Sequence, residues 1–387
     1  MITDPLGIVA VLVSIIGLIL YSAEHPYLRK ACSFLPPVFW IYLLPMLAAT
    51  FGLLPRESAV YSFISSHFLP ASLVLLLISS DIRGILKLGP AALIMMMAGS
   101  FGILIGGPIV LIIFQPWLPE GIWAGFGALS GSWIGGSANM IAIKEGIGTP
   151  DHIFFPIVVL DTILSYSWMG LIIALAAFQG KYDAWNRSRK DLVERLSGGR
   201  EETGQKTPTI EIRGMALIFG TALVASRLSS SAAGYLPEIQ GAVSSYTWTI
   251  IIASLAGAAL SATRLRKLES YGASRVGYGL LYLVLASIGV RGDLAHIAAV
   301  PVLIAAGMTW LVIHAGVLLA ASRLTRAPLF FVAVASQANV GGPVSAPVVA
   351  EIYRPGLAAV GVLMAVVGNI TGTFLGILCA QLCKYVS

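Results

Sequence analysis

Ten runs of mostly apolar residues, each long enough to cross a bilayer, constrain this chain more than any other feature. They lie near 5–22, 36–54, 60–80, 89–114, 151–178, 213–231, 245–262, 272–290, 295–320 and 355–381. A helix needs about 20 apolar residues to cross the hydrocarbon core, so the runs predict an all-α polytopic membrane protein. Charged residues make up 11% of the chain, against about 25% in soluble domains. This composition excludes a soluble enzyme, and the scattered basic residues form no stripe that would bind nucleic acid.

Two further segments, 121–148 and 328–350, have small and polar centres. Their sequences are SGSWIGGSAN at 130–139 and SQANVGGPVS at 336–345. The apolar flank on each side is only about ten residues long, which is too short to span the membrane alone. Each segment is therefore predicted to be either a glycine-broken helix or a re-entrant hairpin.

The sequence repeats itself around one polar stretch. Residues 179–212 are predicted to be a linker with one short surface helix around 183–196, between a first repeat at 1–178 and a second at 213–387. LLLISSDIRGIL at 75–86 aligns with LVLASIGVRGDL at 283–294, and the two glycine centres align at an offset of 206 residues. The shared order and the near-constant offset indicate an internal duplication.

Charge predicts the orientation of the two repeats. If both glycine-centred segments re-enter, each repeat crosses five times and the repeats are inverted. With 179–212 in the cytoplasm, 19 of the 24 Lys and Arg residues then lie inside, against 16 if both segments cross. Cytoplasmic loops carry the excess of Lys and Arg, so we expect inverted repeats with both termini outside. The absence of a transit peptide favours a bacterial plasma membrane.

The two glycine centres are predicted to form a binding site. Irregular backbone at membrane depth occurs where it is buried in protein or lines a cavity, and matched breaks in two repeats indicate a transporter's central site. Unwound carbonyls can coordinate sodium, and bared helix N-termini favour anions. Glycine permits the sharp turn. We expect substrate at Ser132, Gly135, Gly136, Ser137, Asn139, Gln337, Asn339, Gly341 and Gly342.

Asp161 is the single residue that most strongly suggests a function, because it is the only acid in the interior of a predicted span. An intramembrane carboxylate is costly unless it is paired, hydrated or protonated, and it therefore suggests function. Ser165 follows one helical turn later, and Asn369 lies at the matching place in the second repeat. The alternative is a purely structural buried acid. We expect the coupling ion at Ser130, Asp161, Ser165, Ser336, Ser345, Asn369 and Thr371.

Other polar residues carry weaker signals. Arg83 and Arg291 lie at span ends and are interpreted as snorkelling anchors, with contact to substrate as the alternative. Lys144 is either a partner for a carboxylate or an anchor at the rim. The five histidines, His314 among them, share no spacing and no ligand set, so no transition-metal site is expected.

Three stretches resemble a known family. GSWIGGSANMIAI at 131–143, DTILSY at 161–166 and SQANVGGPVSAPVVA at 336–350 are similar to the YjcL-like (DUF819-type) membrane proteins of bacteria and plastids. That family is similar to a distant branch of the superfamily of cation–proton antiporters and anion transporters, which includes sodium symporters for glutamate and bile acids. The resemblance implies a scaffold domain and a mobile core domain that work as an elevator, usually in dimers. It also implies sodium and substrate at 132–139 and 336–345. The motifs of the glutamate symporters are not matched strictly, so the substrate does not carry over.

These observations predict a secondary transporter for a small organic anion or amino acid, coupled to sodium and acting as a homodimer in lipid. One alternative is a sodium/proton antiporter that uses Asp161. An intramembrane enzyme needs a nucleophile and a base, and no such pair converges in the sequence. A channel is also less favoured, because its function does not call for two matched helix breaks. No phosphate-binding loop is present, which argues against ATP-driven transport, and no organic cofactor is expected.

Overall fold

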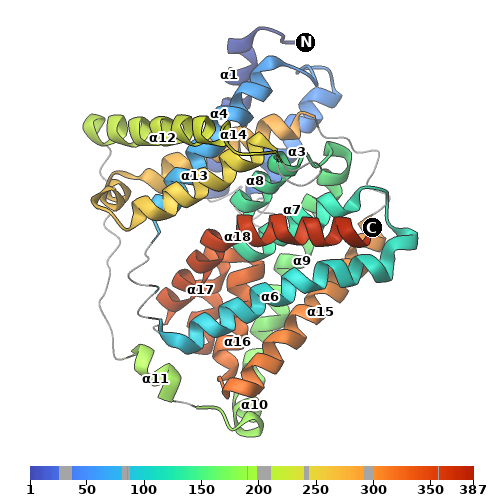
Figure 1. Cartoon of the computed structure of the whole chain (residues 1–387), viewed down its shortest axis with the longest axis vertical. Coiled ribbons are helices and arrows are strands. Elements are labelled where there is room, and N and C mark those ends of the chain that lie inside the picture. Colours follow the sequence, from blue (N-terminus) through green and yellow to red (C-terminus); the bar gives the residue numbers. More distant parts are fainter. Residues whose placement is uncertain are drawn as a thin grey trace. The chain divides into compact units, whose positions relative to one another are not determined.

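The computed structural model describes residues 1–25, 37–80, 85, 88–189, 191–197, 211–238, 244–291, 300–355 and 357–387. Within these ranges the chain is helical and contains no strand (Figure 1). The helices of the first half are α1 (Pro5–Glu24), α3 (Pro37–Thr50), α4 (Ala59–Ile78), α6 (Gly89–Phe114), α7 (Ile122–Gly135), α8 (Ser137–Ile147) and α9 (Asp151–Leu175). Two short helices follow, α10 (Gln179–Asn186) and α11 (Asp191–Ser197). The second half contains α12 (Ile212–Ala233), α13 (Ser245–Ser261), α14 (Ala273–Gly289), α15 (Val300–Thr325), α16 (Leu329–Val340), α17 (Gly342–Tyr353) and α18 (Ala358–Val386).

The apolar runs form helices close to their predicted bounds. Among the described residues, seven helices are long and apolar enough to cross a membrane, or eight if the bent pair of α13 and the 3-10 helix Arg264–Tyr271 counts as one span. This confirms an all-helical, multi-pass protein. Two helices are shorter than predicted: α3 has 14 residues where a span was predicted at 36–54, and α14 has 17 where one was predicted at 272–290.

The surface helix predicted at 183–196 is instead two helices. Arg187 ends α10 with a φ of 52°, in the left-handed region, and a helix cannot continue through that conformation. Residues 198–210 of the predicted linker lie outside the described residues, as do Arg83 and the rest of 81–84.

The seven main helices of the two halves follow the same order. Their first residues pair at offsets of 205 to 214 residues, from Pro5 with Ile212 to Asp151 with Ala358. This agreement between helix positions supports the duplication predicted from the motifs. The inversion of the repeats stays a prediction.

The chain forms two compact units, and each unit takes segments from both halves. Unit 1 contains 1–79, 144–162 and 208–298, and unit 2 contains 80–143, 163–207 and 299–387. The division passes through α8 and α9, so each of these helices contributes residues to both units.

Unit 1 is built around α4, which packs against α12, α13 and α14. Leu75 and Ile78 of α4, Ile218 of α12 and Leu268 belong to its apolar core. Gly257 of α13 lets that helix approach the backbone of α4 closely, because an added Cβ would lie 2.9 Å from the Val74 carbonyl oxygen.

Unit 2 is built around α18, against which α6, α7, α16 and α17 pack. In Figure 1, α6 (cyan) and α15 (orange) run side by side within this unit. Trp310 of α15 is fully buried and donates a hydrogen bond to the Ile103 carbonyl oxygen of α6, 2.8 Å away. Both predicted glycine centres lie in unit 2.

Candidate functional site

The second glycine centre is the tip of a helical hairpin. The Leu329 N–H, at the start of α16, donates to Asp183 Oδ1 of α10 at 2.9 Å. Arg354, which follows α17, lines a cavity together with Asp183. Both ends of the α16–α17 pair therefore lie beside α10, and the two helices run back on each other. Gly342, with a φ of 66°, makes the turn.

The first glycine centre also folds back. The Ile143 side chain of α8 lies against Gly131 of α7, and a Cβ added at Gly131 would lie 3.2 Å from the Asn139 carbonyl oxygen. Twelve residues along a continuous helix would separate Gly131 from Ile143 by about 18 Å, so α8 doubles back on α7. Gly136, with a φ of 82°, makes this turn. Of the two predicted arrangements, the structure has the hairpin at both centres.

Three glycines of α18 let it pack directly on the backbone of the first hairpin. A Cβ at Gly372 would lie 2.8 Å from Gly135 Cα, and one at Gly376 would lie 3.0 Å from Gly131 Cα. Gly368 lies against the Ile134 carbonyl oxygen. Small residues allow this approach between membrane helices, and the approach brings Asn369 to the hairpin tip.

Asn139 joins the first hairpin to α18. Its side chain is 3% exposed, and Nδ2 donates to the carbonyl oxygens of Gly135 at 2.6 Å and Asn369 at 3.2 Å. Its Oδ1 accepts from the Thr373 hydroxyl. The predicted ligand Asn139 thus has both ends of its side chain bonded within unit 2.

Gln337 and Asn339 of the second hairpin are different, because their oxygens are unpaired. Both side chains are fully buried, and their NH₂ groups donate to Ser345 Oγ at 2.8 Å and Ser100 Oγ at 3.0 Å. Among the described residues no donor reaches Gln337 Oε1, Asn339 Oδ1 or the buried Oδ1 of Asn369. Buried polar atoms in native proteins are nearly always bonded, so these three acceptors are candidate ligand-binding atoms.

The orientation of the Asn339 amide follows from its neighbour. The Ser100 hydroxyl donates to the Met96 carbonyl oxygen at 3.1 Å, so the Ser100 oxygen is left as an acceptor. The group of Asn339 that faces Ser100 must be NH₂, and its oxygen points elsewhere. A Cβ at Gly99 would clash with that oxygen, so a larger residue there would have to displace the Asn339 amide.

Behind the second hairpin lies a directed chain of hydrogen bonds. Trp168 Nε1 can only donate, and it bonds Ser336 Oγ at 2.9 Å. His314 Nδ1 bonds the Gly99 carbonyl oxygen at 2.9 Å and so carries a proton, while Nε2 lies 3.0 Å from Ser336 Oγ. Neutral His314 therefore accepts the Ser336 proton at Nε2. The Ser336 hydroxyl, predicted to bind the ion, is committed to this chain.

Sequence reasoning missed Trp168, Ser100 and His314. His314 had a detectable signal, because it is an ionisable side chain inside the apolar run of α15, the criterion that singled out Asp161.

The remaining predicted residues divide into three groups. The hydroxyls of Ser130 and Thr371 bond carbonyls of their own helices, Gly127 at 2.7 Å and Val367 at 3.0 Å. Ser132 is buried, Ser137 is half-buried, and Ser165 donates to the Val340 carbonyl oxygen at 3.1 Å. Asp161 is half-buried on α9 and belongs to unit 1, whereas the other predicted site residues belong to unit 2.

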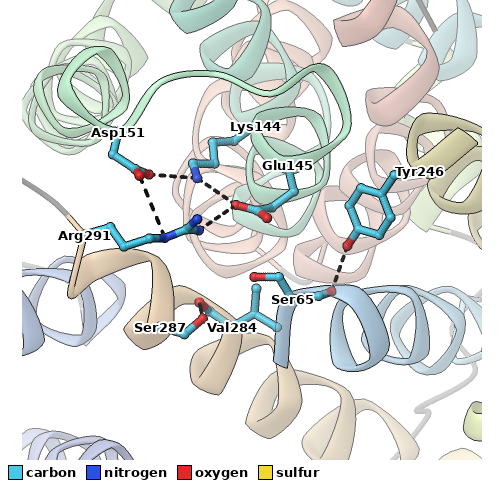
Figure 2. A network of polar contacts seen from close by, with 8 residues as sticks. All are labelled: Ser65, Lys144, Glu145, Asp151, Tyr246, Val284, Ser287 and Arg291. Carbon is cyan, nitrogen blue, oxygen red and sulfur yellow. Dashed lines mark hydrogen bonds and ion pairs between the residues drawn. The ribbon is translucent and has the colours of Figure 1, made fainter. Parts of the chain in front are cut away.

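Unit 1 contains a second polar centre, a ring of four charged side chains (Figure 2). Lys144 Nζ contacts Glu145 Oε1 at 2.7 Å and Asp151 Oδ1 at 2.8 Å. Arg291 contacts the same two carboxylates, at 3.2 Å to Glu145 and 3.8 Å to Asp151. Lys144 is 4% exposed and Glu145 13%, whereas Asp151 is 25% and Arg291 30% exposed, so this is a partly buried, charge-balanced network.

Local structure brings the ring together. Asp151 is the first residue of α9, where the N-terminal end of the helix dipole favours an acid. The Thr149 N–H donates to the Lys144 carbonyl oxygen at 2.8 Å and closes the turn between α8 and α9. Arg291, interpreted as a snorkelling anchor, pairs with two carboxylates that the sequence analysis did not assign to it. Of the two alternatives for Lys144, the structure has the carboxylate partner.

Comparison with known proteins shows the family of this chain. The sequence profile of the family described as "Protein of unknown function (DUF819)" matches residues 10–386. The chain belongs to the DUF819 family. The Bacillus subtilis (strain 168) protein described as "Uncharacterized membrane protein YjcL" is 27% identical over 351 residues, which cover 86% of each chain. Membership of DUF819 confirms the resemblance that the glycine motifs predicted.

Proposed function

We propose that this DUF819 protein is a secondary active transporter that couples sodium to a small organic anion or amino acid. The observation that carries the proposal concerns three carboxamide oxygens on α16 and α18, Gln337 Oε1, Asn339 Oδ1 and Asn369 Oδ1, which no donor reaches among the described residues. Neutral oxygens without donors suit a cation that has lost its water, because they coordinate the cation without adding a charged ligand to the bilayer.

The charge pattern of the hairpins supports a cation as the first ligand. Residues 121–143 and 329–350 contain no Lys, Arg, Asp or Glu, so a bound ion there would keep its charge. The second helix of each hairpin, α8 and α17, begins at the glycine turn. Helix N-termini favour negative charge, and a substrate carboxylate would find these ends beside the cation.

Ion and substrate would then help each other to bind. A cation held by neutral oxygens attracts an anionic substrate, and coupling of this kind is reciprocal in free energy. Inverted repeats with 179–212 in the cytoplasm would allow one unit to move against the other for alternating access. The resemblance to elevator transporters suggests a homodimer in a bacterial plasma membrane, with no enzymatic step and no organic cofactor.

Thermal unfolding of the purified protein in detergent tests the ion site. NaCl, KCl and choline chloride are compared at equal ionic strength. A ligand that binds only the folded state stabilises it by about 2.7 kcal/mol at a hundredfold excess over Kd. We expect a saturable rise in Tm with Na⁺ alone. Equal curves for the three salts across pH would contradict sodium coupling.

One substitution separates ligand binding from stability. Asn369→Ala removes an oxygen that has no donor, and the loss of an unpaired acceptor costs little folding free energy. We expect the variant to unfold like wild type without salt and to lose the Na⁺ response. Thr309→Val is the control, because that half-buried hydroxyl on α15 bonds only its own helix, at the Ala305 carbonyl oxygen. A full Na⁺ response in Asn369→Ala would remove Asn369 from the site.

Asp161 supports a second candidate, a sodium/proton antiporter. It is a half-buried acid on an apolar helix, and such an acid can carry a proton. In proteoliposomes, Asp161→Asn should then abolish Na⁺/H⁺ exchange. Sodium-driven uptake of an organic substrate that persists in Asp161→Asn would favour the symporter.

A further inference from the structure

A cavity of about 270 Å³ lies at the open end of the second hairpin, in unit 2. Its lining residues are Gln179, Gly180, Asp183 and Ala184 of α10 and Arg354 beyond α17. A water molecule occupies about 30 Å³ in the liquid, so the cavity has room for a polar group of several non-hydrogen atoms. It lies at the opposite end of the hairpin from the glycine turn.

The cavity brings together a base, an acid and an amide that are not paired with one another. Among the described residues no hydrogen bond or ion pair engages the guanidinium of Arg354. Gln179 Nε2 is buried and has no acceptor within the described part of the chain. Asp183 is 7% exposed, and the Leu329 N–H occupies Oδ1. In the described part of the chain no hydrogen bond or ion pair engages Asp183 Oδ2, so each of the three residues can still bind a polar group.

The surroundings of the cavity are those of a membrane border. The apolar helical stretch Asp151–Asn186 is 36 residues long, well beyond the roughly 20 that cross a bilayer, and α10 is its polar end. Phe178 and Trp185 flank the cavity in sequence and are 53% and 64% exposed. Exposed aromatic rings are typical of the lipid headgroup level.

Basic side chains accompany both rings. Lys181 Nζ lies 5.8 Å from the centre of the Phe178 ring, and the Arg323 guanidinium lies 4.9 Å from that of Trp185. Basic residues at this level attract phosphate groups of lipids. The residues around the cavity are therefore of the kinds that gather where headgroup phosphates lie.

We propose that this cavity binds an ammonium-bearing phosphate group, the chemistry of the phosphatidylethanolamine headgroup. The phosphate accepts charge-assisted hydrogen bonds from Arg354 and the Gln179 amide, and the ammonium donates to Asp183 Oδ2. Both free charges of the cavity are then compensated. A phosphate alone would leave the Asp183 carboxylate unpaired, and a quaternary ammonium has no N–H to donate.

Binding there would brace the second hairpin. Asp183 already holds the first residue of α16, and Arg354 follows the last residue of α17. A ligand that joins them ties both ends of the hairpin to α10. The proposal does not depend on sodium coupling or on the identity of the transported substrate.

The test uses the full chain, stripped of lipid and reconstituted in phosphatidylcholine nanodiscs. Equal fractions of phosphatidylethanolamine or phosphatidylglycerol are added in parallel, and soluble ethanolamine phosphate is added to a third sample. Tm and lipid adducts in native mass spectrometry are measured. We expect a higher Tm and a retained adduct with the ethanolamine lipid. An effect of the soluble compound alone identifies the same site with a soluble ligand.

Two variants test the assigned groups. Arg354→Gln should weaken retention of the ethanolamine lipid by about tenfold or more, and its exposed position makes misfolding no concern. Asp183→Asn keeps an oxygen for the Leu329 N–H but removes the charge, so it should abolish the preference over phosphatidylglycerol. Arg189→Gln is the control, since Arg189 is 52% exposed and pairs with the exposed Asp191.

Three results would overturn the proposal. The first is equal behaviour of wild type in all lipids and with soluble ethanolamine phosphate. The second is equal stabilisation by phosphatidylglycerol, which carries phosphate without an ammonium. The third is wild-type retention in Arg354→Gln. None of these results bears on the sodium response, so the two proposals fail separately.

Discussion

Replacing Lys144 with methionine tests whether the charged ring holds unit 1 together. Methionine keeps most of the side-chain volume and removes the cation that contacts both carboxylates, at 2.7 and 2.8 Å. Arg291 remains, 3.2 Å from Glu145 but 3.8 Å from Asp151. Asp151 is thus the acid that loses its close partner.

The magnitude follows from burial. Removing one partner of a buried ion pair costs about 3–5 kcal/mol, because the other charge is left uncompensated. Asp151 is 25% exposed and keeps a distant guanidinium, so we expect the lower end, about 3 kcal/mol. For a unit of 150–250 residues, each kcal/mol lowers Tm by about 2–4 °C, which gives roughly 6–12 °C.

The assay compares three proteins by thermal unfolding in the same detergent. Lys144→Met should unfold earliest. The double variant Lys144→Met with Asp151→Asn leaves the pair of Arg291 and Glu145 and is again charge-balanced, so it should recover more than half of the lost Tm. Arg189→Met also removes a base from an ion pair, but that pair is exposed, and such pairs contribute about 0–1 kcal/mol.

Two results would refute this reasoning. If Lys144→Met unfolds with wild type, the ring contributes no net stability. If the single and double variants lose the same amount, the cost comes from packing around Lys144 and not from an uncompensated carboxylate.

Two further substitutions probe unit 2. Thr373→Val removes the donor to Asn139 Oδ1 and should cost about 1–3 kcal/mol by leaving a buried acceptor unpaired; Thr373→Ser should restore most of this in the same unfolding assay. Gly372→Ala forces a methyl group to within 2.8 Å of Gly135 Cα and should cost about 1–3 kcal/mol. Gly316→Ala, on a helix face with no atom within 4 Å of the added Cβ, should be neutral or slightly stabilising, and equal effects of the two alanines would contradict the close packing.

The helices were largely predictable from the sequence because each depends on local composition. Apolar runs and glycine breaks set where α9 and α18 begin and where α7 and α16 end, and these positions agree within a few residues. The division of 183–196 into α10 and α11 was not predictable, because it depends on a left-handed Arg187. No glycine or proline marks that position in the sequence.

The candidate site was predictable by region but not by role. Both hairpin tips carry the expected amides and hydroxyls, yet bonding separates them: Asn139 is used in packing, whereas Gln337 and Asn339 keep free oxygens. That distinction depends on Thr373, more than 200 residues from Asn139, and on Ser100, more than 200 residues from Asn339. The charged ring was missed for the same reason, because Arg291 meets Glu145 across 146 residues.

The two units differ in how their charged residues are placed, and this decides which of them can bind an ion. The ring in unit 1 compensates its own charges, with two bases and two acids in contact, so it has no net charge to offer an ion. Residues 121–143 and 329–350 of the two hairpins contain no Lys, Arg, Asp or Glu. Among the described residues no donor reaches the buried amide oxygens of Gln337, Asn339 and, on α18, Asn369, so any charge beside these oxygens must arrive with a ligand. A site built only of neutral acceptors favours an entering cation, and it releases that cation more readily than a carboxylate would because no full opposite charge holds it. Reversible binding of this kind is what a coupling ion requires in every transport cycle.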